Sequence, residues 1–291
     1  MFQGSYVALI TPFSNGSIDE TKFQSFVEWQ ITEGTDGLVP CGTTGESSTF
    51  SHGEHERVID LCVEVARGRV PVLAGAGSNA TEEAISLTRH AKQAGADGSL
   101  QVTPYYNKPT QEGLYRHFKA IHDAVDLPLV IYNIPGRSVV DMSVDTMARL
   151  AKLPNVVGVK DASNDPVRPL KTRIACGPDF DQLSGEDPSV LALLANGGHG
   201  CISVTGNVAP RQCAEMHNAW KAGDHAGALT IQQRLQPLHE ALFMEASPSA
   251  VKYAASLIDL CSPAVRLPLV ECLEATKTAI EAAMRSSGVL N

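Results

Sequence analysis

Short apolar runs alternate with longer amphipathic stretches along most of the chain. The apolar runs have the length of buried strands, and the amphipathic stretches repeat their apolar residues at helical spacing. The predicted strands cover residues 6–10, 37–41, 70–74, 98–102, 129–132, 156–160, 182–184 and 201–204. The predicted helices between them cover residues 21–33, 55–67, 82–94, 111–125, 144–152 and 189–195. Successive strands lie about 25–30 residues apart, which is the length of one βαβ unit.

Strands that alternate with helices predict a parallel sheet, and eight such units predict an α/β fold of the (β/α)8 TIM-barrel type. A doubly wound open sheet is the alternative, because it is built from the same units. Gly158, Ser184 and Ser203 favour the barrel, since they are small or polar candidates for the layers that fill a barrel interior. Polar residues also follow many different strands, whereas an open sheet gathers its chemistry at one switch point.

The C-terminal part of the chain has helical periodicity and no further strand pattern. The predicted helices there cover residues 208–222, 226–243, 249–260 and 269–287. No linker rich in Ser, Gly or Pro separates them from the preceding units. We therefore expect a catalytic barrel domain over residues 1–222 and a C-terminal three-helix extension over residues 223–291.

Composition and charge exclude several classes of protein. A chain of 291 residues buries enough surface to fold without disulfides or a structural metal. The formal net charge of −9 argues against a nucleic-acid partner, and no apolar run reaches the ~20 residues of a membrane helix. No signal peptide is recognisable, and the seven cysteines are scattered and odd in number, which is typical of a reducing compartment. We expect a cytoplasmic protein.

Two motifs suggest a cofactor or a metal but carry little weight. Residues 75–80 match the G-x-G-x-x-A pattern of dinucleotide-binding turns, but no acidic residue ends the next predicted strand. A tight turn with Asn79 as helix N-cap and Glu82 as its capping-box partner explains the pattern. His52 and His55 lack a third ligand nearby, and His199 lies in a glycine-rich turn where a structural role is expected. We expect no metal and no nucleotide cofactor.

Lys160 is the unusual residue of the chain, because it ends the nearly pure apolar run from residue 156. A strand that is buried on both faces has no natural place for an ammonium group. Burial penalises the charged form of an amine, and a neutral amine is a nucleophile near neutral pH. A lysine side chain that extends past the strand end to solvent is the alternative.

Other polar groups are expected at the same rim of the barrel. Tyr132 ends the preceding strand, and a phenol beside an amine can transfer protons. The loop at residues 42–46 offers consecutive backbone N–H groups that suit a small carboxylate, although a simple polar turn is the alternative. Arg137 offers a second carboxylate site, and the pair Tyr105–Tyr106 is typical of an interface.

Three motifs together resemble the pyruvate-dependent class I aldolase family, which includes N-acetylneuraminate lyase. They are Gly-Thr-Thr-Gly-Glu-Ser at residues 42–47, Tyr-Asn-x-Pro at 132–135 and Val-Gly-Val-Lys-Asp at 157–161. Segments at residues 103–107, 111–115 and 197–200 extend the resemblance over the whole chain. Within this family, Arg137 after Pro135-Gly136, together with Tyr105–Tyr106, resembles the branch that joins pyruvate to L-aspartate 4-semialdehyde. That reaction is the first committed step toward diaminopimelate and lysine.

The resemblance implies a cofactor-free lyase mechanism. Lys160 would form a Schiff base with pyruvate, whose carboxylate would bind the amides of Thr43 and Thr44. The enamine would attack the semialdehyde, whose carboxylate Arg137 would hold. The proton relay implied for this reaction consists of Thr43, Tyr132 and, from a neighbouring subunit, Tyr106. Gly185 and Ile202 would line the pyruvate pocket.

The resemblance also implies a homotetramer that lysine inhibits. The positions implied for the inhibitor are Ser48, His52, His55, Gly77, Asn79, Glu83 and Tyr105. An N-acetylneuraminate lyase or a 2-keto-3-deoxy sugar-acid aldolase is the alternative activity, but a polyol substrate needs hydroxyl partners rather than the guanidinium of Arg137. A non-catalytic protein on the same scaffold is the more distant alternative.

Overall fold

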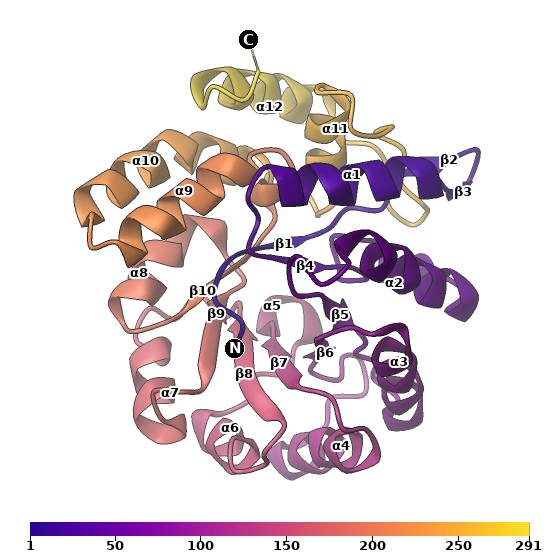
Figure 1. The fold of residues 1–291 in the computed structure, drawn as a ribbon, viewed down its shortest axis with the longest axis vertical. Helices are drawn as coiled ribbons and strands as arrows, with labels where there is room; N and C mark the ends of the chain where they lie inside the picture. Colours follow the sequence, from indigo (N-terminus) through magenta and orange to yellow (C-terminus); the bar gives the residue numbers. More distant parts are fainter. Residues whose placement is uncertain (291) are drawn as a thin grey trace. The chain divides into compact units, whose positions relative to one another are not determined.

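The structure, a computed structural model, describes residues 1–290. Its main sheet contains eight strands in the order β4-β1-β10-β9-β8-β7-β6-β5, and at least one helix separates each of these strands from the next along the chain (Figure 1). This is the predicted (β/α)8 barrel fold, followed by C-terminal helices. The sheet strands are β1 (Gly4–Ala8), β4 (Gly37–Val39), β5 (Leu73–Gly75), β6 (Gly98–Val102), β7 (Leu129–Asn133), β8 (Val156–Asp161), β9 (Asp181–Ser184) and β10 (Gly200–Ser203).

Helices account for most of the remaining chain. They are α1 (Glu20–Thr32), α2 (His52–Ala66), α3 (Thr81–Ala94), α4 (Gln111–Ala124), α5 (Pro135–Ser138), α6 (Val144–Leu150), α7 (Arg168–Cys176), α8 (Val190–Ala195), α9 (Pro210–Lys221), α10 (His225–Ala241), α11 (Ser249–Ser256) and α12 (Glu274–Ser286). Short 3-10 turns are η1 (Ser47–Thr49), η2 (Asp187–Ser189) and η3 (Thr205–Asn207), and a small hairpin joins β2 (Phe13–Ser14) to β3 (Ser17–Ile18).

All eight predicted strands overlap observed ones, but two local predictions were wrong. The strand expected from residue 70 begins only at Leu73, because Pro71 has no N–H to donate and the N–H of Val72 donates to the Asp97 carboxylate at 2.8 Å instead of to a neighbouring strand. Asn79 does not cap α3. The N-cap is Ala80, which makes no side-chain cap bond, and Asn79 instead donates through Nδ2 to the Tyr105 carbonyl at 3.2 Å. Helix α7 was not predicted.

The chain forms two compact units. Unit 1 contains residues 1–3 and 71–202, and unit 2 contains residues 4–70 and 203–290. In unit 1, strands β5 to β10 pair in parallel, each with the next along the chain. Helices α3, α4, α6 and α7 form an arc outside these strands (Figure 1). The strands are mostly buried, as expected for parallel strands that are covered on both faces.

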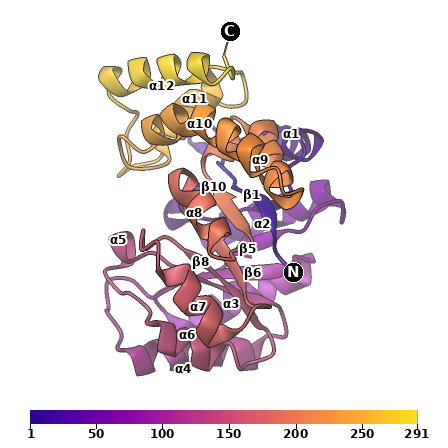
Figure 2. The same cartoon turned by 90° about the vertical axis from the view of Figure 1, so that its left-hand side faces the viewer.

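In unit 2, β1 pairs in parallel with β4, and Tyr6 of β1 fills the space beside Gly37. Helix α10 packs on α9 and α12, and α11 packs on α12 (Figure 2). The three helices predicted for the C-terminal extension are therefore present as α10, α11 and α12. Among residues 1–290, no helix is both long enough and apolar enough to cross a bilayer.

Gly158 of β8 allows close approach of two backbones in unit 1. A Cβ atom at this position would lie 2.5 Å from the Asp181 carbonyl oxygen and 2.8 Å from its Cβ. Neither neighbour belongs to a flexible side-chain end, so β8 and β9 would have to separate. The position therefore requires glycine because of space, not because of its backbone conformation.

Gly158→Ala is expected to lower the free energy of unfolding by about 1–3 kcal/mol, since overpacking forces the two strands apart. Urea denaturation followed by circular dichroism measures this change. The matched control is Gly53→Ala in α2, where no atom lies within 4 Å of the added Cβ. The control should be neutral or more stable by up to about 1 kcal/mol. Equal stability of both variants would contradict the steric argument.

Candidate active site

Lys160 and Tyr132 lie side by side in unit 1. They are register partners in the β7–β8 pairing, which places their side chains on the same face of the sheet. The Nζ atom of Lys160 lies 4.3 Å from the centre of the Tyr132 ring. The Lys160 side chain is only 6% exposed, and Tyr132 is buried too. The structure thus confirms a buried amine in contact with a phenol ring at the end of β8.

The predicted pocket residues Gly185 and Ile202 come from the two following strands. A Cβ atom at Gly185 would lie 3.2 Å from Cε of Lys160, so the absence of a side chain there leaves room around the amine. Ile202 is fully buried in β10, which pairs with β9 next to β8. Gly185 thus lies beside the Lys160 side chain, and Ile202 contributes an apolar side chain two strands away.

A network of polar side chains that the sequence analysis missed fixes the ends of β7 and β8. Asn133 donates through Nδ2 to Asp141 at 2.8 Å and to Asp161 at 3.2 Å. Arg168, at the start of α7, lies 2.9 Å from Asp161 through Nε and 3.2 Å from Asp141 through Nη1. Asn133 and Asp161 directly follow Tyr132 and Lys160, so their position in the two motifs was the available signal.

Glu186 is a further residue that the sequence analysis missed. It follows Gly185 and lines a cavity of about 60 Å³ together with Asp161 and Ser184, among other residues. Burial raises the pKa of its carboxyl group, while the positive charges of Lys160 and Arg137 act in the opposite direction. These electrostatic effects place Arg137, an exposed residue of α5, in the same charged environment as Lys160.

Four residues predicted for the lysine site lie at the start of α3 and after β6. Asn79 bonds to the Tyr105 carbonyl, and Glu83 accepts a short hydrogen bond from Ser78. Partial burial raises the pKa of Tyr105, and the negative charge of Glu83 raises it further. Gly77 has no room for a side chain, since a Cβ atom would lie 2.4 Å from the Val102 nitrogen. Unit 1 therefore brings this part of the predicted site together.

Tyr106 extends from the same loop into solvent. Its side chain is 91% exposed, and its backbone has the unusual φ angle of +69°. A large aromatic side chain held in this way has no packing partner within the described chain. The role of Tyr106 across a subunit contact stays a prediction.

In unit 2, the loop after β4 turns tightly around Thr43 and Thr44. The N–H of Gly45 donates to the Gly42 carbonyl, and the N–H of Glu46 donates to the Thr43 carbonyl, each at 3.1 Å. No hydrogen bond within residues 1–290 engages the N–H groups of Thr43 and Thr44. The two amides are thus available to a carboxylate.

The remaining predicted lysine-site residues follow in the same segment of unit 2. Ser48 is exposed in η1, and His52 and His55 lie in the first two turns of α2. The start of α2 is fixed by a capping box between Ser51 and Glu54. Within the part of the chain that the structure describes, no three His, Cys, Asp or Glu side chains form a metal site.

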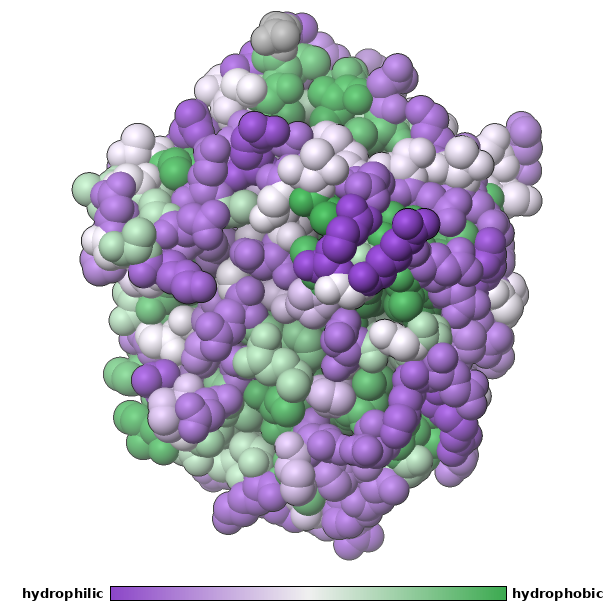
Figure 3. All heavy atoms as spheres, viewed as in Figure 1, coloured by the Kyte–Doolittle hydropathy of each residue, from purple (hydrophilic) through white to green (hydrophobic). Residues whose placement is uncertain are grey.

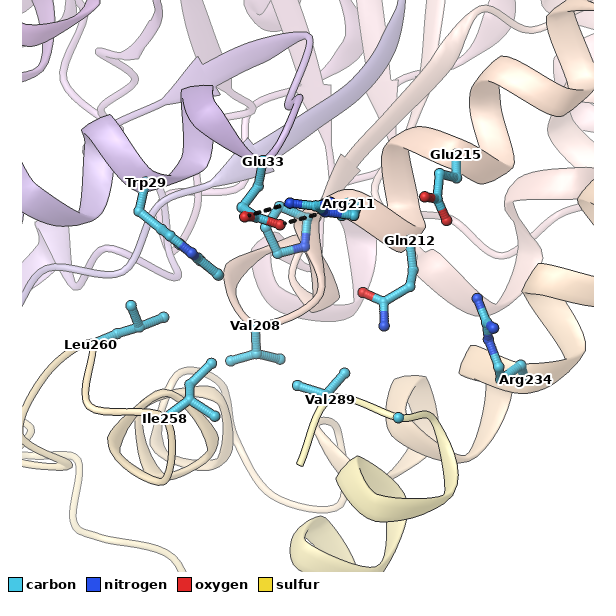
Figure 4. A pocket seen from close by; sticks show the side chains of 12 residues that line it. Trp29, Glu33, Val208, Arg211, Gln212, Glu215, Arg234, Ile258, Leu260 and Val289 are labelled. Atoms are coloured by element: carbon cyan, nitrogen blue, oxygen red, sulfur yellow. Dashed lines mark hydrogen bonds and ion pairs between the residues drawn. The ribbon is translucent and has the colours of Figure 1, made fainter. Parts of the chain in front are cut away.

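A surface pocket of about 530 Å³ lies elsewhere in unit 2 (Figure 4). Its walls include Trp29, Val208 and Ile258, and its facing ions Glu33 and Arg211 are already joined by two hydrogen bonds of 2.9 Å. None of the predicted site residues lines it. The pocket therefore offers no nucleophile and is not a candidate active site.

Comparisons with known proteins agree with these observations. The model of the Dihydrodipicolinate synthetase family matches residues 1–287. A relative from Rhodospirillum centenum, named 4-hydroxy-tetrahydrodipicolinate synthase, is 69% identical over 290 residues and covers 100% of both chains. A solved structure of chloride-inhibited dihydrodipicolinate synthase from Acinetobacter baumannii, complexed with pyruvate, has a TM-score of 0.97 and 44% identity over 100% of both chains. The corresponding protein from Cyanidioschyzon merolae with lysine bound has a TM-score of 0.96 and 37% identity over 99% of both chains. The chain described here therefore belongs to the dihydrodipicolinate synthetase family.

Proposed function

We propose that the chain is a lyase-type enzyme that condenses pyruvate with L-aspartate 4-semialdehyde to 4-hydroxy-tetrahydrodipicolinate. The observation that carries this proposal is the buried Lys160 amine against the Tyr132 ring, in a chain whose relatives bear the name of this activity. A buried amine beside a phenol suits Schiff-base chemistry, because the amine can attack a carbonyl while the phenol exchanges protons with the intermediates.

The reaction begins with attack of the Lys160 Nζ on the ketone carbon of pyruvate. Loss of water gives an imine, and loss of a methyl proton gives an enamine. The enamine carbon attacks the aldehyde of the second substrate and forms the new carbon–carbon bond. The amino group of that substrate then attacks the imine carbon, closes the ring and releases Lys160. Tyr132 is the proposed donor and acceptor of protons, since its ring already contacts the amine.

Two carboxylates have to be held during these steps. We assign the pyruvate carboxylate to the unengaged amides of Thr43 and Thr44, and the semialdehyde carboxylate to the guanidinium of Arg137. The hydroxyl of Thr43 joins the proton relay with Tyr132. Gly185 and Ile202 line the pyruvate pocket and exclude water from the imine.

We propose that the enzyme is a homotetramer in which Tyr106 of one protomer completes the relay of its neighbour. The exposure of Tyr106 supports one contact. A second apolar surface supports another subunit contact, because Val167, directly before α7, and Leu170 and Ile174 within α7 are exposed, Ile174 by 78%. Figure 3 shows one face of the molecule coloured by hydropathy. Hydrophobic atoms gather over α7 at the left edge of that view.

Lysine is the proposed inhibitor, at the residues named above from Ser48 to Tyr105. The lysine-bound relative from Cyanidioschyzon merolae supports this assignment. Acidic and amide groups such as Glu83 and Asn79 suit an amino acid with a second cationic end. We further propose a cytoplasmic location, since all seven cysteines are free thiols in the described structure.

Borohydride reduction in the presence of pyruvate tests the nucleophile. We expect a stable pyruvyl adduct on the peptide that contains Lys160, detected by mass spectrometry, because borohydride reduces the imine to a secondary amine. Lys160→Arg should show no adduct. An adduct on a different lysine, or none in the unsubstituted protein, would falsify the mechanism.

Tyr132→Phe tests the proton relay with little change in packing. The phenylalanine ring can still cover the Lys160 Nζ but cannot exchange a proton. We expect kcat to fall roughly 10²- to 10⁴-fold, the usual contribution of a general acid–base group. Steady-state kinetics measures the change, and thermal unfolding should show a fold as stable as that of the unsubstituted protein. A kcat within threefold of the original would exclude Tyr132 from the relay.

Arg137→Ala tests the second carboxylate site. Loss of a charge-assisted contact of about 1.5–3 kcal/mol should lower kcat/KM for the semialdehyde roughly ten- to hundredfold. Formation of the pyruvate adduct should stay within about twofold, because Arg137 does not hold pyruvate. Equal loss of both steps would indicate a structural role. Turnover of N-acetylmannosamine in place of the semialdehyde by the unsubstituted protein would favour the alternative activity.

A further inference from the structure

We propose that Lys252 and Arg266, two cations of the C-terminal segment, are positioning residues for the two ligand-binding segments of unit 2. Lys252 acts through Glu46 on the loop that carries Thr43 and Thr44. Arg266 acts through Glu54 on the start of α2. This inference rests on the proposed function, because it takes pyruvate and lysine as the ligands of these segments.

The contact between Lys252 and Glu46 is fully buried. The Nζ atom of Lys252 lies 2.8 Å from Oε1 of Glu46, and both side chains are 0% exposed. The same Nζ donates to the Thr11 carbonyl at 3.0 Å and lies 4.0 Å from the centre of the Phe13 ring. Oε2 of Glu46 accepts the backbone N–H of Arg266 at 2.9 Å. Both carboxylate oxygens are therefore committed to the C-terminal segment.

Glu46 transmits this contact to the threonine loop. It adopts the left-handed conformation with φ of +59°, which is uncommon for a residue that is not glycine. In this conformation its side chain reaches inward to Lys252, while its N–H closes the turn on the Thr43 carbonyl. Thr11, which binds Lys252 through its carbonyl, also donates through Oγ1 to the Gly45 carbonyl at 2.9 Å. Glu46 and Thr11 therefore each contact both Lys252 and the turn that carries Thr43 and Thr44.

A buried ion pair of this kind is weak evidence for a role in stability. The removal of both charges from water offsets much of the attraction between them, and apolar replacements are often as stable. Burial lowers the pKa of Lys252, and the Glu46 carboxylate opposes that effect. The pair does favour a single arrangement of the two side chains, because a buried charge without its partner is strongly destabilising. That property suits a loop whose amides have to meet a carboxylate.

Arg266 makes the second contact with its side chain. Nη2 lies 2.6 Å from Oε1 of Glu54, and Nη1 lies 3.1 Å from Oε2, so the two groups form a bidentate pair. The guanidinium lowers the pKa of Glu54 to about 2. Glu54 also accepts the N–H of Ser51 at 2.9 Å in the capping box, which sets where α2 begins. His52 and His55 lie in the same first turns of α2 as Glu54.

One residue thus contacts both carboxylates. The backbone of Arg266 binds Glu46, and its guanidinium binds Glu54. A shift of Arg266 would move the loop that carries Thr43 and Thr44 and also the start of α2. Such a shared response is the physical requirement for coupling between two sites. The Nη2 atom also donates to the Gly16 carbonyl at 2.8 Å and so ties the β2–β3 hairpin to the same point.

Arg266→Lys tests the coupling, because lysine keeps the charge and the backbone N–H but loses the two-point contact. We expect the lysine concentration for half inhibition to rise at least tenfold, while kcat without lysine stays within threefold. The matched control is Arg57→Lys, which breaks a bidentate pair with Glu20 at 2.7 and 3.1 Å on the exposed side of α2. This control should leave inhibition unchanged.

The double variant Glu46→Gln, Lys252→Met tests the loop, since it removes both charges at once and leaves no unpaired ion. We expect KM for pyruvate to rise roughly tenfold, and pyruvate at high concentration should restore adduct formation at Lys160. A well-folded double variant with unchanged KM overturns the role of Lys252. Should the double variant not fold, unchanged KM in Glu46→Gln alone overturns it.

The unsubstituted protein separates this inference from the proposed function. If it forms no pyruvate adduct, the proposed function fails. If it forms the adduct but ignores lysine, or if Arg266→Lys is inhibited like the Arg57→Lys control, the role of Arg266 is overturned while the Schiff-base function stands.

Discussion

An amine that reacts with a ketone has to be shielded from water and still be free of an anionic partner, and unit 1 meets both requirements at Lys160. The β8 strand buries its side chain, and the Tyr132 ring covers the nitrogen. Asp161 is the next residue, but strand geometry directs it to the opposite face, where Arg168 and Asn133 bind its carboxylate. No ion pair within residues 1–290 joins Lys160 to an acid. The neighbouring charges thus hold the strand end in place without forming an ion pair with the Lys160 amine.

Periodicity and single anomalies are what the sequence could reveal. The eight strands were predictable because parallel strands buried on both faces read as apolar runs at regular spacing. Lys160 could be singled out for the opposite reason, since burying one ammonium group in such an apolar run is energetically unfavourable. The pairing of Tyr132 with Lys160 followed from both residues ending neighbouring strands. In each case the feature that allowed the prediction lies within one strand or in two strands that follow each other along the chain.

Contacts between distant parts of the chain could not be predicted in this way. Lys252 and Glu46 are 206 residues apart, and nothing in the helical pattern of α11 marks one lysine as buried. Arg168 was missed together with α7, because the prolines around its start weaken the helical pattern there. The predicted N-cap, Asn79, lies one residue before the observed one, Ala80, and its side chain donates to the Tyr105 carbonyl instead. Local hydrogen bonds of this kind depend on tertiary neighbours that the sequence does not reveal.

The two units use the same device to hold their functional residues. In unit 1, the acid directly after the nucleophile, Asp161, binds Arg168 from a later helix. In unit 2, the acid two residues after the threonine pair, Glu46, binds Lys252 from a much later one. A carboxylate next to a functional residue is thus anchored by a cation that belongs to another element, so the position of the functional residue depends on tertiary packing rather than on its own loop. Because reaction rates are sensitive to displacements of about 1 Å, the energetic cost of burying these ions is offset where position matters most, at the proposed nucleophile and at the amides to which we assign the substrate carboxylate.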